Sequence, residues 1–180
     1  PWALPMFTVP KRNGDVRPVI DYTPLNAVTI PEHEPLPIIR DLIDRLNGAK
    51  VFSVLDIEWA FWNISLHPES VELTSFITSF GQFEWLVLPM GVRNGVSVFQ
   101  RELRRVLGDL EGRGVELYCD DLIVYSKTIE EHRDLLTRLF TCLSREGLRL
   151  KREKCKFFET EVEFLGFVIS AGRVRASPTK

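Results

Sequence analysis

The sequence has few cysteines, no long hydrophobic run and no excess of positive charge. Its three cysteines, Cys119, Cys142 and Cys155, follow no zinc-binding spacing, and an odd number does not suggest a disulfide framework. No stretch approaches the roughly 18 apolar residues of a membrane-spanning helix, and no secretory signal is visible, so we expect no membrane partner. These absences favour a reducing compartment, either the cytoplasm or the nucleus.

The chain also lacks the basic charge that is typical of autonomous nucleic-acid binding. Its formal net charge is −2 and its pI is near 6.0, whereas proteins that grip the phosphate backbone usually present a basic surface. Any contact with nucleic acid must therefore be local or come from other parts of a longer protein. The sequence opens at Pro1-Trp2 without an initiator methionine, which suggests a piece of such a protein.

What is present is ample material for a hydrophobic core. Hydrophobic residues make up 44% of the chain, with 12 phenylalanines and 4 tryptophans, and this composition argues against disorder. A length of 180 residues suits one domain, or one domain with a subdomain.

Residue spacing and turn signals predict the helices and strands. A β-hairpin is expected over residues 6–22, because Asn13-Gly14 tolerates the positive φ of a tight turn. Thr128 and Glu131 form a capping-box pattern at the start of the clearest helix, and Gly147 follows its end. The other expected elements are a hairpin over 74–87, helices over 38–47, 94–110 and 128–146, strands over 51–57, 115–119, 122–126 and 162–169, and an irregular segment over 23–37. Interleaving without regular βαβ spacing predicts an α+β fold with antiparallel hairpins.

Three aspartates stand at the ends of apolar strands. Asp120 and Asp121 lie between two such strands, and Asp56 ends another. A solvated Asp-Asp turn is one interpretation of the pair, since turns favour aspartate. Asp56 favours a different interpretation, because a lone charge beside a hydrophobic strand is costly to bury. A strand-end Asp facing a hairpin-tip Asp pair would offer hard oxygen ligands to Mg²⁺ or Mn²⁺, although the sequence by itself leaves open whether the three carboxylates meet.

The segment Tyr118-Cys119-Asp120-Asp121 resembles the Tyr-x-Asp-Asp box of retroviral and retrotransposon reverse transcriptases. Leu55-Asp56-Ile57 with Phe61 is similar to the strand that carries the first catalytic aspartate of that family. Further blocks in family order are Val9–Asn26, Trp85–Val92, Asn94 with Phe99-Gln100, Tyr125–Lys127, Glu131-His132, Lys154–Phe157 and Phe164–Ser170. Together the blocks cover almost the whole chain and are most similar to the gypsy type of long-terminal-repeat retrotransposon, with retroviruses as cousins.

The resemblance implies a right-hand polymerase fold, with an antiparallel palm sheet backed by helices, a fingers hairpin and no thumb before Lys180. Residues 1–50 and 73–90 correspond approximately to the fingers, and residues 51–72 and 91–180 to the palm. The implied activity is that of an RNA- and DNA-directed DNA polymerase, which adds deoxynucleotides to a primer 3′-hydroxyl with two Mg²⁺ or Mn²⁺ ions. The implied partners are an RNA or DNA template with its primer, deoxynucleoside triphosphates, and the thumb and RNase H regions of a parent polyprotein.

The resemblance also assigns roles to individual residues. The catalytic carboxylates are Asp56, Asp120 and Asp121, and the backbone carbonyl of Ile57 joins them as a metal ligand. Lys11 and Arg17 would clamp the triphosphate, which suits paired cations facing a polyphosphate. The other nucleotide-binding residues are Glu58, Trp59, Ala60, Phe61 and Met90. The primer-binding residues are Tyr118, Cys119, Phe164, Leu165 and Gly166.

Some positions depart from the family pattern. Glu58-Trp59 brings bulk and negative charge to a stretch where relatives have small or polar residues, and Asn94–Ser97 lacks the family's proline. These departures motivate an alternative function: a host-adopted, catalytically silent module that acts as a protein- or nucleic-acid-binding scaffold with a protein partner. An unrelated metal-dependent nuclease or cyclase with a similar palm is disfavoured by the fingers blocks.

Overall fold

The computed structural model describes residues 2–10, 14–32 and 37–177. The chain forms two compact units, one made of Pro1–His33 and Trp59–Phe99 and the other of Glu34–Glu58 and Gln100–Lys180. Most of the expected fingers residues fall in the first unit and most of the expected palm residues in the second. Residues 34–50 belong to the second unit, however, and residues 59–72 and 91–99 to the first. The fingers and palm boundaries stay a prediction.

The second unit is built on a four-stranded antiparallel sheet. Its strands, in spatial order, are β6 (Val115–Tyr118), β7 (Asp121–Ser126), β3 (Val51–Asp56) and β8 (Lys156–Glu159). The predicted strands over 51–57, 115–119 and 122–126 are thus confirmed to within a residue or two. Because β3 lies between two neighbours and is rich in β-branched and aromatic residues, it forms the buried centre of the unit.

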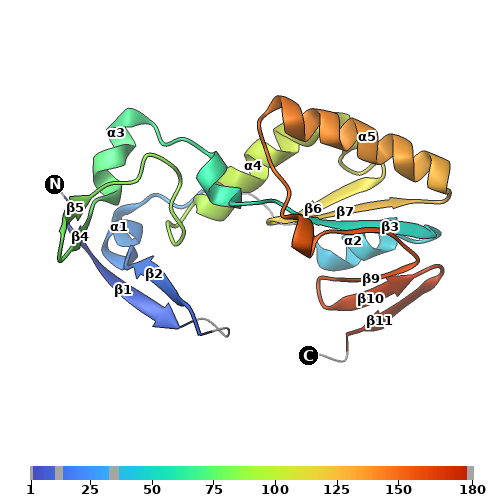
Figure 1. Ribbon diagram of the computed structural model, residues 1–180, viewed down its shortest axis with the longest axis horizontal. Coiled ribbons are helices and arrows are strands. Elements are labelled where there is room, and N and C mark those ends of the chain that lie inside the picture. The colour runs from blue at the N-terminus through green and yellow to red at the C-terminus, as the bar shows by residue number, and fades with distance from the viewer. Residues whose placement is uncertain (1, 11–13, 33–36, 178–180) are drawn as a thin grey trace. The chain divides into compact units, whose positions relative to one another are not determined.

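Helices cover both faces of this sheet. Figure 1 shows α5 (Ile129–Arg145) across one face and α2 (Ile39–Arg45) across the other. The Thr128 cap of α5 is confirmed, because its hydroxyl accepts a hydrogen bond from the Glu131 backbone N–H. The Glu131 carboxylate accepts its hydrogen bond from the N–H of Lys127, one residue before the cap. Helix α4 (Gly95–Leu107) continues into a 3₁₀ turn over Gly108–Leu110, which together match the helix expected over 94–110.

A second, three-stranded antiparallel sheet corrects one prediction. Its strands are β9 (Glu161–Phe164), β10 (Phe167–Ser170) and β11 (Arg173–Ala176), in the order β11-β10-β9. The single strand expected over 162–169 is wrong, because the chain reverses at Leu165-Gly166, where both residues have positive φ. A two-residue turn of this kind usually carries Asn or Gly at its first position, and Leu165 there made the apolar run look continuous.

One hydrophobic core joins the two sheets of the second unit through α2. Side chains alternate between the faces of a strand, so β3 and β7 each contribute to this core from one face only. Its buried members are Leu42, Ile43, Leu46, Ala49, Phe52, Ile123, Val162, Phe164 and Ile169. Packing on a shared core fixes β9 and β10 against the sheet that carries the aspartates.

The first unit contains a four-stranded sheet in the order β2 (Val16–Ile20), β1 (Leu4–Pro10), β4 (Phe76–Thr78) and β5 (Gly81–Phe83). Strands β1 and β2 form the expected antiparallel hairpin, and β4 and β5 form the second one. Strands β1 and β4 pair in parallel, which departs from the expected antiparallel pattern. The turn residues 11–13 lie outside the described part of the chain.

Short helices complete the first unit. The irregular segment expected over 23–37 begins instead with helix α1 (Thr23–Val28), which has a proline in its first turn. Proline fits there because the first helical N–H groups need no partner within the helix. Helix α3 (Pro68–Val71) and 3₁₀ turns over Ala60–Asn63 and Glu72–Thr74 follow. Along the described ranges, no helix combines the length and the apolar character needed to cross a membrane.

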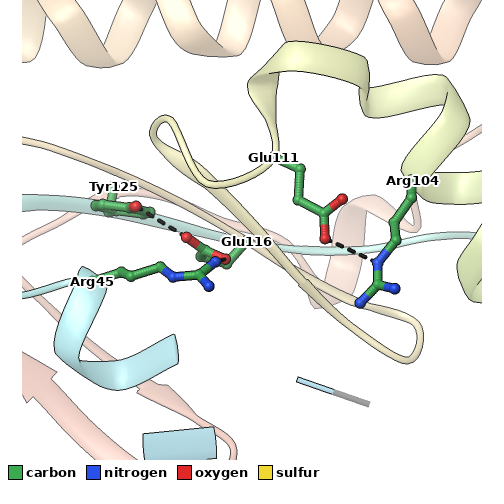
Figure 2. Close-up of polar contacts among 5 residues, drawn as sticks. All are labelled: Arg45, Arg104, Glu111, Glu116 and Tyr125. Carbon is green, nitrogen blue, oxygen red and sulfur yellow. Dashed lines mark hydrogen bonds and ion pairs between the residues drawn. The ribbon is translucent and has the colours of Figure 1, made fainter. Parts of the chain in front are cut away.

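A buried carboxylate ties α2 to the central sheet. Figure 2 shows Glu116 of β6 accepting hydrogen bonds from Arg45 Nη1 and from the Tyr125 hydroxyl, each at 3.1 Å. Burial raises the pKa of Glu116, and the Arg45 guanidinium opposes this change. The same view shows Arg104 Nε 3.0 Å from Glu111 Oε1. With Glu116 only 3% exposed, removing Arg45 would leave a buried charge without its counter-ion, so this contact fixes the position of α2.

His132 lies fully buried between α5 and the sheet. Its Nδ1 is 3.0 Å from Ser126 Oγ and its Nε2 is 2.7 Å from Ser53 Oγ. The Ser126 hydroxyl donates to the Thr128 carbonyl, so it accepts from Nδ1–H, and Nε2 then accepts from the Ser53 hydroxyl. A neutral imidazole satisfies every bond of this network, and burial lowers the pKa of His132.

Stability is therefore expected to fall in mild acid because of His132. An unfolded histidine has a pKa near 6.5, so the contribution of the neutral imidazole is complete above about pH 6.5. Below it the unfolded chain takes up a proton that the folded chain resists, and up to about 1.4 kcal/mol of unfolding free energy is lost per pH unit. Urea unfolding between pH 7.5 and 5.5 measures how steeply the unfolding free energy falls with pH. This pH dependence should be weaker in His132→Gln and unchanged in His67→Gln, a control at an exposed site. Equal pH dependence in the two variants would contradict the role of a neutral, buried His132.

Candidate active site

The register of the central sheet brings Asp56 opposite Asp121. Asp56 is the last residue of β3 and Asp121 the first residue of β7, and the two are paired across the antiparallel ladder. Asp120 precedes Asp121 in the two-residue turn between β6 and β7, which Cys119 enters with a φ of 56°. A turn this short needs positive φ, so the strained Cys119 backbone presents both aspartates at the hairpin tip.

The three carboxylates influence one another electrostatically. The pKa of Asp121 is raised by burial and then by the charges of Asp120 and Asp56, while Lys154 opposes the change. The pKa of the Cys119 thiol is raised by burial and by the two neighbouring aspartates. Clustered negative charges repel one another, and a bound cation relieves this repulsion, so this end of the sheet is suited to binding a cation.

Lys154 supplies a positive charge at this cluster. Its Nζ lies 2.7 Å from Asp56 Oδ2, and this hydrogen bond is the main reason that the pKa of Lys154 is raised. The residue sits on a 3₁₀ turn over Arg152–Lys154. The sequence interpretation assigned Lys154 no role, although the Lys154–Phe157 block was the signal that pointed to it.

The donor types at the cluster fit a hard divalent cation. Lys151 N–H donates to the Asp56 carbonyl and Glu58 N–H to the Arg149 carbonyl, on either side of the Ile57–Leu150 bridge. In that pattern the Ile57 carbonyl points away from residue 150, so these bonds leave it free to act as a ligand. Carboxylate and carbonyl oxygens suit Mg²⁺ or Mn²⁺. In the described part of the chain, however, no three Asp, Glu, His or Cys side chains are arranged as a metal-binding group.

The expected nucleotide-binding residues are divided between the units. Arg17, exposed on β2, and Trp59, Ala60, Phe61 and Met90 belong to the first unit, and Glu58 belongs to the second. Trp59 is 61% exposed with a φ of 56°, and the ring of Phe61 packs 5.3 Å from that of Phe99. Lys11 lies outside the described residues. Nucleotide binding by this set stays a prediction.

Three of the five expected primer-binding residues share one hydrophobic core. Phe164 is buried in the core cluster of the second unit, and Tyr118 and Leu165 pack against it. Leu165-Gly166 forms the tight turn between β9 and β10. Tyr118, which precedes the Asp-Asp hairpin, and this turn therefore pack on the same hydrophobic core, and primer binding by this set stays a prediction.

An antiparallel sheet that presents a strand-end aspartate opposite an Asp-Asp hairpin, backed by helices, defines the palm of a nucleic-acid polymerase. The family model described as reverse transcriptase (RNA-dependent DNA polymerase) matches residues 9–169, so the chain belongs to the reverse transcriptase family. The resemblance inferred from the sequence is confirmed.

Curated relatives come from retrotransposons. The Pol polyprotein from transposon opus of Drosophila melanogaster is 36% identical over 185 residues, and that from transposon gypsy of the same organism is 35% identical over 186. Each alignment covers 100% of this chain and 18% of the relative's length. The Tf2-3 polyprotein of Schizosaccharomyces pombe is 33% identical over 168 residues, covering 93% of this chain and 13% of that protein. The chain therefore spans less than a fifth of the length of these relatives.

Solved structures of retroviral enzymes share the fold. The foamy viral protease-reverse transcriptase dRH in complex with double-stranded DNA matches with a TM-score of 0.90 and 26% identity, covering 98% of this chain and 31% of that one. The foamy viral protease-reverse transcriptase in complex with RNA/DNA hybrid matches with a TM-score of 0.89 and 25% identity, covering 98% of this chain and 24% of that one. The expected α+β palm and fingers architecture is confirmed.

Proposed function

We propose that this chain is the polymerase domain of a reverse transcriptase, which adds deoxynucleotides to a primer 3′-hydroxyl on an RNA or DNA template with two divalent cations. The observation that carries the proposal is the pairing of Asp56 with Asp121 across β3 and β7, with Asp120 in the adjoining turn. Membership of the reverse transcriptase family supports it.

The candidate residues divide between metal binding, primer binding and nucleotide binding. Asp56, Asp120 and the Ile57 carbonyl hold two Mg²⁺ or Mn²⁺ ions, and Asp121 completes the carboxylate cluster. When bound, the ions lower the pKa of the 3′-hydroxyl and neutralise charge on the phosphates. Tyr118, Cys119, Phe164, Leu165 and Gly166 support the primer end. Lys11, Arg17, Glu58, Trp59, Ala60, Phe61 and Met90 form the nucleotide side.

The proposed partners follow from the chemistry and from the solved neighbours. Foamy viral relatives were solved with double-stranded DNA and with RNA/DNA hybrid, which supports a template–primer duplex as the partner of this chain. A chain with a net charge of −2 is expected to bind a duplex only weakly by itself. We therefore assign part of the grip to thumb and RNase H regions of the longer parent protein.

A second candidate function has one observation in its favour. Asp56 is engaged by Lys154, and no three-ligand metal group forms among the residues that the structure describes. A catalytically silent scaffold with a protein partner would need no metal, and its aspartates could keep such an ion pair permanently.

Primer extension by the full-length parent protein tests the two candidates. The expected result is extension on both RNA and DNA templates that requires Mg²⁺ or Mn²⁺ and stops when a chelator is added. The matched control is the same protein with deoxynucleotides replaced by ribonucleotides. The family resemblance places the Phe61 ring under the sugar, where it would clash with a 2′-hydroxyl, so extension should slow. Absence of extension on either template, together with a protein partner that co-purifies stoichiometrically, would replace the polymerase proposal with the scaffold.

A further inference from the structure

The strongest contact at the aspartate cluster is an ion pair within the chain. Lys154 Nζ lies 2.7 Å from Asp56 Oδ2, with side-chain exposures of 58% for the lysine and 22% for the aspartate. A charge-assisted hydrogen bond of this length is among the stronger kinds in proteins. Asp120 and Asp121 attract the same ammonium group electrostatically. Lys154 thus interacts favourably with all three carboxylates.

The backbone around Lys154 positions it for this contact. The Lys151 N–H donates to the Asp56 carbonyl at 2.9 Å, and the Glu58 N–H donates to the Arg149 carbonyl at 2.8 Å. These bonds anchor the chain beside the end of β3, and the Lys154 N–H then closes the 3₁₀ turn on the Lys151 carbonyl at 3.0 Å. Since the anchor is made by main-chain groups, the lysine side chain can move while its backbone stays in place.

We propose that Lys154 is a built-in counter-ion of the aspartate cluster, and that a divalent cation must displace its ammonium group from Asp56 to bind. This inference rests on the proposed polymerase function. Mg²⁺ binds carboxylate oxygen at about 2.1 Å, so it competes with the ammonium group for the same face of Oδ2, and the two positive charges repel. Lysine is suited to this exchange because its flexible stem lets the charged group leave without disturbing the fold.

The exchange has a consequence for the order of binding. While Lys154 neutralises Asp56, the carboxylates stay together without metal, and the affinity of the empty cluster for free cation is lowered. A cation that arrives with a polyphosphate brings extra ligands with it and displaces the lysine more readily than a free one.

Calorimetric titration of the 180-residue chain with Mn²⁺ tests the exchange. Lys154→Met is expected to bind Mn²⁺ roughly three- to tenfold more tightly than the wild-type chain, because a competing ion pair is removed. The matched control is Lys156→Met, which removes an exposed lysine two residues along on β8 and should stay within about twofold of the wild type.

The outcomes separate this inference from the function on which it rests. If the wild-type chain binds Mn²⁺ and Lys154→Met binds it equally or more weakly, the counter-ion role is wrong and the polymerase proposal stands. If neither chain binds Mn²⁺, both are overturned. Lys154→Gln serves as a second variant with the same expected direction, and thermal unfolding of each variant shows that the chain is folded during the titration.

Discussion

Asp120→Asn is expected to reduce the primer-extension rate of the parent protein by at least about a hundredfold at saturating nucleotide. The substitution keeps the shape of the side chain and removes one of the two charges at the hairpin tip. Metal-assisted charge stabilisation is worth several kcal/mol, and about 1.4 kcal/mol corresponds to a tenfold change in rate. The loss should appear in kcat, because the metal ligand acts on the transition state.

The loss must be separated from unfolding. Asp120 is exposed, and its charge raises the pKa of Asp121, so neutralising it relieves repulsion and should leave the unfolding temperature equal or higher. Asp134→Asn is the matched control, since it makes the same chemical change at an exposed position of α5 and should leave the rate within about twofold. Extension that survives Asp120→Asn would contradict the metal role of the cluster.

Gly114→Ala is expected to lower the unfolding free energy by about 3 kcal/mol. Gly114 leads into β6 with a φ of 102°, and a Cβ added there would lie 2.5 Å from Leu135 Cδ1. Leu135 is 6% exposed on α5, so it has little room to move aside. The Gly114 carbonyl also accepts the Tyr125 N–H at 2.9 Å, which ties this residue to β7. Alanine therefore combines backbone strain with a steric clash.

A second glycine separates strain from the clash. Gly172 has a φ of 69° and no atom within 4 Å of an added Cβ, so Gly172→Ala should cost only about 1 kcal/mol. Urea unfolding of both variants against the wild type measures the difference. Equal losses would mean that contact between β6 and α5 is looser than the structure indicates. A larger loss for Gly114→Ala should be accompanied by weaker Mn²⁺ binding, because β6 and β7 carry the aspartate hairpin.

Local patterns predicted most elements of the second unit. The capping pair Thr128 and Glu131, the β-rich run of β3 and the strands around Asp120 all depend on neighbouring residues, and all were confirmed. Two predictions failed where a local signal was unusual. Leu165 occupies a turn position that normally takes Asn or Gly, and Pro24 lies in the first turn of α1, where the segment looked irregular.

The aspartates were found by the order of motifs along the chain, but their surroundings were not. Asp56 and Lys154 are 98 residues apart, and Ser53 and His132 are 79 apart. Neither pair leaves a spacing pattern, because the distance is set by strand order and register rather than by local geometry. The Lys154 block was visible in the sequence without any indication of which acid it would contact.

The sequence by itself thus determined the family and the α+β class and predicted the three candidate aspartates, because these depend on residue identity, periodicity and motif order. Only the tertiary structure decided that Asp56 stands opposite Asp121 and that Lys154 forms an ion pair with Asp56. It also decided that residues beside the Asp-Asp hairpin and the Leu165-Gly166 turn pack on one hydrophobic core. The physical reason is that side-chain charges act over a few ångströms, whereas the residues that carry them meet only after strands distant in sequence have paired.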